Sequence, residues 1–160
     1  MSISPGSDLT LLLLAGFRSL ADAAQTELAI RGYQDVRPAN AFAIRAIASG
    51  ADTAAELART LTVSKQAAAQ TIAVLQERGY VTRAVDPNDA RRRRLQVTDH
   101  GFDMLHESEV IFDELRAQWS KQIGADKLKE METHLAQLTG PGPLRFDTPG
   151  WSSRDLGGTA

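Results

Sequence analysis

Apolar residues recur at helical spacing through the first third of the chain. From Ser7, a candidate N-cap, to about Arg31, they repeat every three or four positions and predict one long helix. Pro38 then opens a second helix, because proline fits the first helical turn. The apolar stripes of the two helices include Leu9, Leu13, Phe17, Leu20, Ala24 and Leu28, then Ala41, Phe42, Ile44 and Ile47.

Local capping signals predict two further helices between residues 53 and 79. Thr53 with Glu56 three positions later is a capping box, so a helix begins there. Ser64 can cap the next helix, and Gly79 ends it, since a left-handed C-terminal cap costs glycine little. Only residues 62 and 63 separate the first of these helices from the cap of the second. This spacing is typical of a helix-turn-helix, whose second helix enters the major groove N-terminus first.

The next segment predicts a β-hairpin. Residues 80–85 and 95–97 are predicted as short strands that flank DPNDARRRR, in which residues 86–89 have strong turn chemistry. The four arginines, Arg91 to Arg94, are therefore expected at or just past the hairpin tip. A helix-turn-helix followed by a basic hairpin is a winged helix. The predicted fold is mainly α with a small β-hairpin wing and long terminal helices.

The last third of the chain predicts two more helices and a tail. Thr98 or Asp99 caps a helix to about Ile123, Gly124 stops it, and another begins near Asp126. The expected division is an N-terminal dimerisation helix (1–36), a winged helix-turn-helix (37–98), C-terminal dimerisation helices (99–139) and a Gly/Pro-rich tail (140–160). The alternative for the terminal helices is an ordinary intramolecular cap.

Two groups of polar residues are candidates for binding nucleic acid. On the second helix of the helix-turn-helix, Lys65, Gln66 and Gln70 face away from the apolar stripe, and glutamine amides can pair bidentately with adenine. Four arginines on a hairpin repel one another and need an anionic partner or full hydration, and a narrow minor groove suits such a side chain. The alternatives are a solvated helix face and a solvated charge run. Because the helix-turn-helix and the arginine run are adjacent in the sequence, we favour DNA binding over these alternatives. The expected DNA-binding residues are Thr53, Ser64, Lys65, Gln66, Gln70, Asp89, Arg91, Arg92, Arg93 and Arg94.

The distribution of charge supports a binding surface confined to one face. Residues 61–97 hold seven Lys or Arg against three acids, whereas residues 98–160 hold six against eleven. A basic unit on an acidic body, with a net charge of −2, argues against nonspecific coating of DNA.

Composition excludes several other classes. With no cysteine there is neither a disulfide nor a thiol redox sensor. The apolar run LTLLLLAGF is too short for a membrane span and lacks a signal-peptide pattern, so we expect a cytoplasmic protein. His106, Glu109 and Asp103 could form a surface metal site, but an acidic helix face with one histidine is commonplace. We predict no metal, no cofactor and no enzymatic activity.

The segments ELARTLTVSKQAAAQTIAVLQERGYVTR and DPNDARRRRLQVTDHG resemble the MarR family of transcriptional regulators. The resemblance implies a homodimer that represses transcription from a palindromic operator. In the family an Asp-Arg-Arg run orients its second arginine into the minor groove, a role that falls to Asp89 and Arg91, although Ala90 replaces the first arginine.

The resemblance also implies release from DNA by a small phenolic or carboxylic aromatic ligand. Phe17, Arg18, Phe42 and Arg45 are its candidate contacts, since stacking and a guanidinium would suit a flat anion. The alternative is that these are core and surface residues. Two rival functions also remain, a winged-helix protein-interaction module and a ligand-independent DNA-binding regulator.

Overall fold

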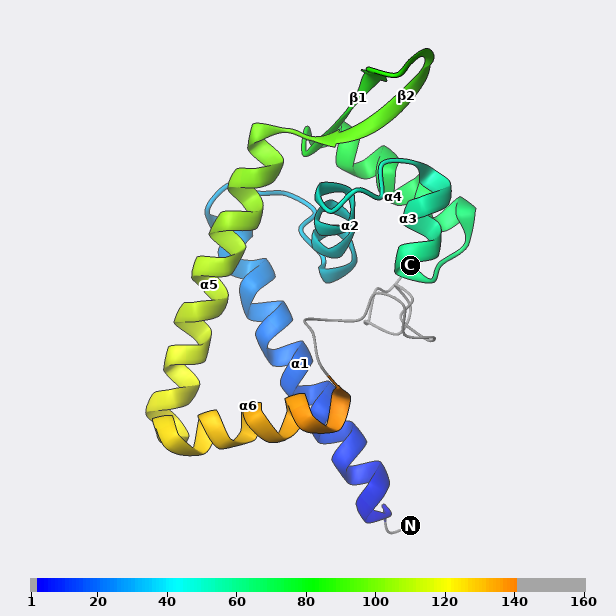
Figure 1. Ribbon diagram of the computed structural model, residues 1–160. Coiled ribbons are helices and arrows are strands. Elements are labelled where there is room, and N and C mark those ends of the chain that lie inside the picture. The colour runs from blue at the N-terminus through cyan, green and yellow to red at the C-terminus, as the bar shows by residue number, and fades with distance from the viewer. Residues whose placement is uncertain (1–2, 141–160) are drawn as a thin grey trace.

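The computed structural model describes residues 3–140, which form six helices and one hairpin (Figure 1). The elements are α1 Pro5–Ile30, α2 Pro38–Ala48, α3 Ala54–Leu61, α4 Lys65–Glu77, β1 Val81–Asp86, β2 Asp89–Val97, α5 Asp99–Ile123 and α6 Ala125–Thr139. Apart from its first residue, the expected tail 140–160 lies outside the described residues. The predicted fold class, mainly α with a β-hairpin wing, is confirmed.

Three of the predicted N-caps are in place. Thr53 Oγ1 accepts from the Glu56 N–H at 3.2 Å, and Ser64 Oγ accepts from the Ala67 N–H at 3.0 Å. For α5 the cap is Thr98, whose Oγ1 accepts from an N–H three residues later, and not the alternative, Asp99. Each side chain satisfies a backbone donor that the first helical turn leaves unpaired.

The expected cap of the first helix was wrong. The N-cap of α1 is Ser4, and the Ser7 N–H donates to its Oγ at 3.2 Å. The helix starts earlier because Pro5 occupies the first helical turn, where its missing N–H has no cost. The last helix likewise begins at Ala125, one residue before the expected start.

Positive backbone angles form the tight turns around α4. Thr62, with φ 54°, ends α3 in the left-handed conformation, so only two residues separate α3 from the Ser64 cap. Gly79, with φ 76°, follows the C-cap of α4 as predicted and turns the chain into β1. Gly124, with φ 97°, ends α5, also as predicted.

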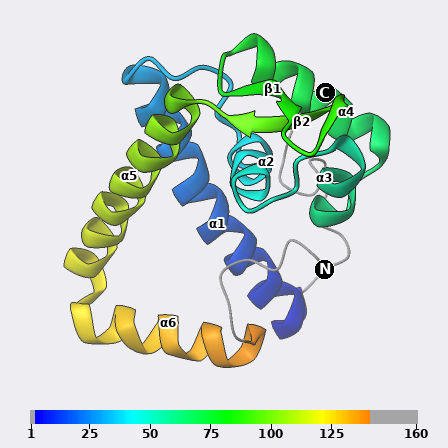
Figure 2. The same cartoon turned by 45° about the horizontal axis from the view of Figure 1, so that its top comes forward.

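The hydrophobic core lies where α2, α3, α4 and β1 meet the ends of α1 and α5 nearest the hairpin. We call α2 through β2 (Pro38–Val97) the winged-helix unit, and α1, α5 and α6 the frame helices. Figures 1 and 2 show the hairpin and α4 on one side of the molecule, and α5 and α6 extending away from them. The largest of the fully buried side chains are Ile44, Leu57, Ile72, Leu75, Tyr80, Met104 and Ile111.

The wing is a two-stranded antiparallel sheet that is longer than the sequence predicted. Its second strand begins at Asp89 and not at Leu95, so Arg91–Arg94 belong to β2. Val85 pairs with Arg93 and Ala84 with Arg94, and a register irregularity follows at Asp86. Apolar alternation is absent from a strand that projects into solvent, which is why the hydrophobic pattern did not reveal this pairing.

The frame helices leave much of their apolar surface uncovered in the single chain. In the first half of α1, four leucines are at least 49% exposed, and at the far end of α6 Leu138 is 83% exposed. Large exposed apolar side chains on the frame helices are Leu9, Leu11, Leu12, Leu13, Ile30, Phe102, Val110, Phe112, Ile123, Met131 and Leu138.

A close contact joins the two parts at Tyr80. The Thr98 N–H donates to the Tyr80 carbonyl at 3.0 Å, and Gly101 packs so closely on the same carbonyl that a Cβ there would clash with it. The same Cβ would lie 2.7 Å from Val97 Cγ1. The first turn of α5 therefore needs glycine for reasons of space.

Candidate nucleic-acid interface

The second helix of the helix-turn-helix, α4, presents a polar face opposite its buried one. Ala68, Ile72 and Leu75 pack into the core. Lys65, Gln66 and Gln70 are exposed, as the sequence predicted from their positions. The amide and ammonium groups at the N-terminal half of α4 are thus free to meet the edges of bases.

The hairpin turn is held by its own aspartates. The Asn88 N–H donates to Asp86 Oδ1 at 2.9 Å, and the Arg91 N–H donates to Asp89 Oδ1 at 3.0 Å. In the described hairpin, the Asp89 carboxylate thus contacts the backbone of Arg91 and not its guanidinium. These two bonds hold the backbone of the turn, but neither of them fixes the direction of the Arg91 side chain.

The four arginines of β2 fall into two groups. Arg91, Arg92 and Arg93 are exposed, and they form no ion pair or side-chain hydrogen bond within residues 3–140. Arg94 differs, since its Nε donates to Asp86 Oδ2 at 2.8 Å and its Nη1 donates to Asp52 Oδ2 at 2.9 Å. Nothing in the sequence indicated this difference.

The Asp86 carboxylate is buried under this contact. Its side chain is 2% exposed. The backbone N–H of Asn88, followed by the Arg94 guanidinium, lowers the pKa of Asp86 below its ordinary value. In the same pair, Asp86 raises the pKa of Arg94. Asp86 is therefore an anion within the wing, where it holds one of the four cations.

A polar cleft of about 370 Å³ separates the wing from α3. Arg59, Arg92 and Arg93 lie on its walls, with Thr53 and Glu56 at the start of α3. The Glu56 Oε2 atom is buried and has no hydrogen-bond partner among the described residues. Thr53 and Ser64 both use their side chains as helix caps, so the structure assigns each a structural contact. DNA contact by either residue stays a prediction.

A second, largely apolar cavity of about 610 Å³ lies between α1, α2 and α5. Three of the four candidate ligand residues, Phe17, Phe42 and Arg45, line it, whereas Arg18 is exposed and is not among its lining residues. Arg45 Nη2 lies 3.3 Å from Glu109 Oε1. The cavity thus has aromatic walls and one guanidinium that is shared with a carboxylate.

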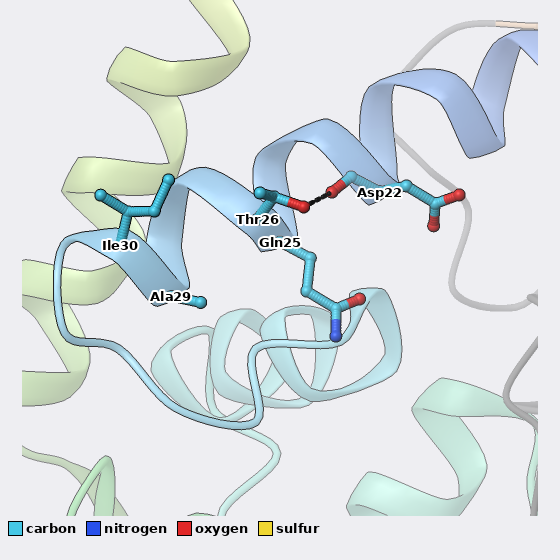
Figure 3. Close-up of a pocket in the computed structure, with 5 residues that line it drawn as sticks. All are labelled: Asp22, Gln25, Thr26, Ala29 and Ile30. Atoms are coloured by element: carbon cyan, nitrogen blue, oxygen red, sulfur yellow. Dashed lines mark hydrogen bonds between the residues drawn. The ribbon is translucent and has the colours of Figure 1, made fainter.

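A shallower pocket of about 660 Å³ runs along the outside of α1, lined by Asp22, Gln25, Thr26, Ala29 and Ile30 (Figure 3). The Thr26 hydroxyl donates back to the Asp22 carbonyl at 3.0 Å, a bond within α1.

The histidine-bearing helix α5 does not supply a metal site in the described residues. Within residues 3–140 there is no group of three or more His, Asp or Glu side chains that could hold a metal ion. His100 instead stacks with Tyr33 and with Tyr80, at ring-centroid distances of 5.4 Å and 5.0 Å. None of the described helices has the length and apolar character needed to cross a membrane.

A helix-turn-helix with a free polar face, beside a hairpin that exposes arginines, defines a winged-helix DNA-binding protein. Residues 34–92 match the model of the MarR family. Together these findings confirm the resemblance, because the winged-helix segment matches the MarR family of DNA-binding transcriptional regulators.

Solved structures share the fold over most of the chain. MarR from E. coli in its apo form is 20% identical with a TM-score of 0.64, over 88% of this chain and 100% of that one. A point mutant of MepR from S. aureus, bound to an oligodeoxyribonucleotide, is 17% identical with a TM-score of 0.58, over 82% and 95%. S. aureus MepR bound to ethidium bromide is 17% identical with a TM-score of 0.57, over 81% and 93%.

Proposed function

We propose that this protein is a cytoplasmic, homodimeric repressor that binds a palindromic operator and is released by a small aromatic anion. The observation that carries the DNA part is the pairing of two free surfaces on one rigid unit, the polar face of α4 and the arginines of β2. The α4 amides would read base edges in the major groove, and Arg91 would enter the flanking minor groove. The MepR mutant complex with an oligodeoxyribonucleotide supports this use of the fold.

The dimer is inferred from the uncovered apolar surface of the frame helices. Leu9, Leu12 and Leu13 share one face of α1, and each is at least 49% exposed. A patch of this kind on a small regulator favours a second copy related by two-fold symmetry. In this arrangement residues 1–36 and 99–139 form the dimer, and residues 37–98 bind DNA.

The ligand is inferred from the cavity between α1, α2 and α5. Phe17 and Phe42 offer aromatic faces, and a ligand carboxylate would compete with Glu109 for the Arg45 guanidinium. The complex of MepR with ethidium bromide supports a small-molecule site in a protein of this fold. The ligand would act by binding the DNA-free dimer more tightly than the DNA-bound dimer.

DNA binding is tested by fluorescence anisotropy with an inverted-repeat duplex whose half-site centres lie about 10 bp apart. A genomic footprint would supply the duplex. We expect the full repeat to bind more tightly than one half-site, and affinity to fall as salt rises. Equal affinity for one half-site and for the repeat would contradict the two-fold arrangement, and binding indifferent to salt would favour a protein-interaction module.

The ligand site is tested by calorimetric titration of salicylate-like acids, with and without the operator. Arg45→Ala should lose binding, whereas Arg18→Ala, a matched variant of an arginine outside the cavity, should keep it. Identical affinity in the wild type and in Arg45→Ala, with and without operator, would remove both the pocket and the release mechanism and leave a ligand-independent regulator.

A further inference from the structure

Arg94 is the only arginine of β2 that is paired with two carboxylates in the described part of the chain. One partner, Asp86, belongs to the end of β1, and the other, Asp52, lies in the loop before α3. The Arg94 side chain is 43% exposed, against 20% for Asp52 and 2% for Asp86. A guanidinium suits this position, because its planar set of donors can meet two acceptors at once.

The position of Arg94 in the strand explains its contact with Asp86. Arg94 is paired with Ala84, and Asp86 stands two residues further along β1. Side chains two apart in a strand share a face, so Arg94 and Asp86 are diagonal neighbours on one face of the hairpin. Arg93, which precedes Arg94 in β2 and is paired with Val85, lies on the opposite face.

The contact with Asp52 joins the wing to the helix-turn-helix. Next to it the Leu95 N–H donates to the Asp52 carbonyl at 2.8 Å, so two successive residues of β2 are bonded to one residue of the loop. Asp52 directly precedes Thr53, the N-cap of α3. The direction of β2 is therefore fixed relative to the start of α3.

We propose that Arg94 is a positioning residue, which sets the direction of the wing and leaves Arg91, Arg92 and Arg93 to meet DNA. This inference rests on the proposed DNA binding and refines it, because the sequence alone grouped all four arginines as DNA contacts. One guanidinium between two carboxylates also carries a local net charge of −1, which makes Arg94 a poor ligand for phosphate.

Substitution of Asp52 distinguishes two roles for Arg94, namely positioning of the wing and direct contact with DNA. If Arg94 contacted phosphate, Asp52→Asn would free it and remove a nearby negative charge, so affinity for DNA would rise. If Arg94 positions the wing, the same substitution loosens β2 and affinity falls, roughly fivefold to tenfold for a broken ion pair of this exposure. The two models thus predict opposite signs.

The experiment measures operator affinity and its salt dependence for Asp52→Asn, Arg94→Gln, the double variant, Arg94→Lys and the control Arg92→Gln. We expect both single variants to weaken binding, the double variant to be no worse than either, and the salt slope to stay near the wild-type value. Arg94→Lys should not rescue binding, since an ammonium keeps the charge but not the two-point bridge. Arg92→Gln should lower the slope by about one.

A second measurement needs no DNA. Hydrogen exchange at the Leu95 amide should quicken in Arg94→Gln and Asp52→Asn, at unchanged helical content, but not in Arg92→Gln. Tighter DNA binding by Asp52→Asn, rescue by Arg94→Lys, or unchanged exchange at Leu95 would each overturn the proposal. Should the wild type bind no duplex while the exchange pattern is as expected, the proposed DNA function fails and the hold of Arg94 on the wing stands.

Discussion

The winged-helix unit and the frame helices differ in how far their apolar side chains are exposed to solvent. In the winged-helix unit the large aliphatic residues of the helices are inside, and Ile44, Leu57 and Leu75 have no exposed surface. In the frame helices, apolar residues face solvent along the first half of α1, along α5 and in the far part of α6. The apolar side chains of the first region are covered within the chain, whereas the second region carries apolar surface that another molecule is expected to cover.

Substitution of leucine in each region should show the largest contrast. Leu57→Ala removes a fully buried side chain and should lower the free energy of unfolding by about 3–4 kcal/mol. Leu12→Ala, at a position 62% exposed in the single chain, should cost the isolated subunit no more than about 0.5 kcal/mol. Urea denaturation measures both values.

The same two variants can also be compared at different protein concentrations, which tests whether a second copy covers α1. If a second copy covers α1, Leu12→Ala should weaken dimerisation, which sedimentation can verify. The unfolding midpoint should then be lower and depend less steeply on protein concentration than in the wild type. Equal losses for Leu57→Ala and Leu12→Ala at low concentration would mean that α1 is covered within its own chain.

The junction between the regions should be the next most sensitive point. Gly101→Ala places a Cβ against the Tyr80 carbonyl and Val97, and neither is the flexible end of a long side chain. We expect a loss of about 3 kcal/mol, measured by thermal unfolding. Gly6→Ala is the matched control, because a Cβ there meets nothing within 4 Å, and it should be neutral or slightly stabilising.

Within the winged-helix unit, substitutions on the polar face of α4 and among the arginines of β2 should change DNA binding in different ways. Arg91→Ala should weaken binding on every sequence, flatten the salt dependence and reduce the A·T preference at the outer site. Gln66→Ala or Gln70→Ala should relax base choice at one position by about 1–3 kcal/mol if the contact is bidentate. Binding of a panel of operator variants measures both effects. A uniform loss for all three substitutions would show that the assignment of roles is wrong.

The smallest expected effect concerns pH. The folded pKa of Asp86 is lowered by the Asn88 N–H and by Arg94, so its stabilising contribution is complete above the unfolded value of about 4 and is lost as pH falls through the folded pKa. Asp86→Asn should therefore be more destabilising at pH 7 than at pH 3.

The frame helices supply a comparison for this effect. The pKa of Glu132 is lowered by Arg116, but this pair is exposed, and Glu132→Gln should change the pH dependence less. Urea midpoints at the two pH values measure the difference. An equal pH dependence for Asp86→Asn and the wild type would remove the role assigned to the Asp86 carboxylate.

Features that depend on neighbouring residues were predictable from the sequence. The caps at Thr53 and Ser64, the stop at Gly79 and the exposed face of α4 follow from spacings of three or four residues. Three of the four candidate ligand residues also meet in one cavity, and two of them, Phe17 and Phe42, were already identified from the apolar stripes of their helices.

Contacts between distant segments were not predictable. Arg94 and Asp52 are 42 positions apart, and nothing in the RRRR run distinguishes its last member. The stacking of His100 with Tyr33 and Tyr80 was unpredictable for the same reason, since three separate segments supply the rings. The first strand residue of β2 was missed because hydrogen bonding to β1, and not a hydrophobic pattern, sets the length of a solvent-facing strand.

The close contact of Gly101 with Tyr80 fixes the first turn of α5, so a rotation about this point moves the other end of the helix furthest. Helix α5 has 25 residues, so it reaches about 37 Å from its first turn. A tilt of only about 5° at the glycine would move its far end by roughly 3 Å at that length. Because the packing of Gly101 on Tyr80 leaves no room for a side chain, we expect such a tilt to be transmitted to the winged-helix unit. A small displacement at the distal end of α5 would then change the orientation of α4 and of the wing.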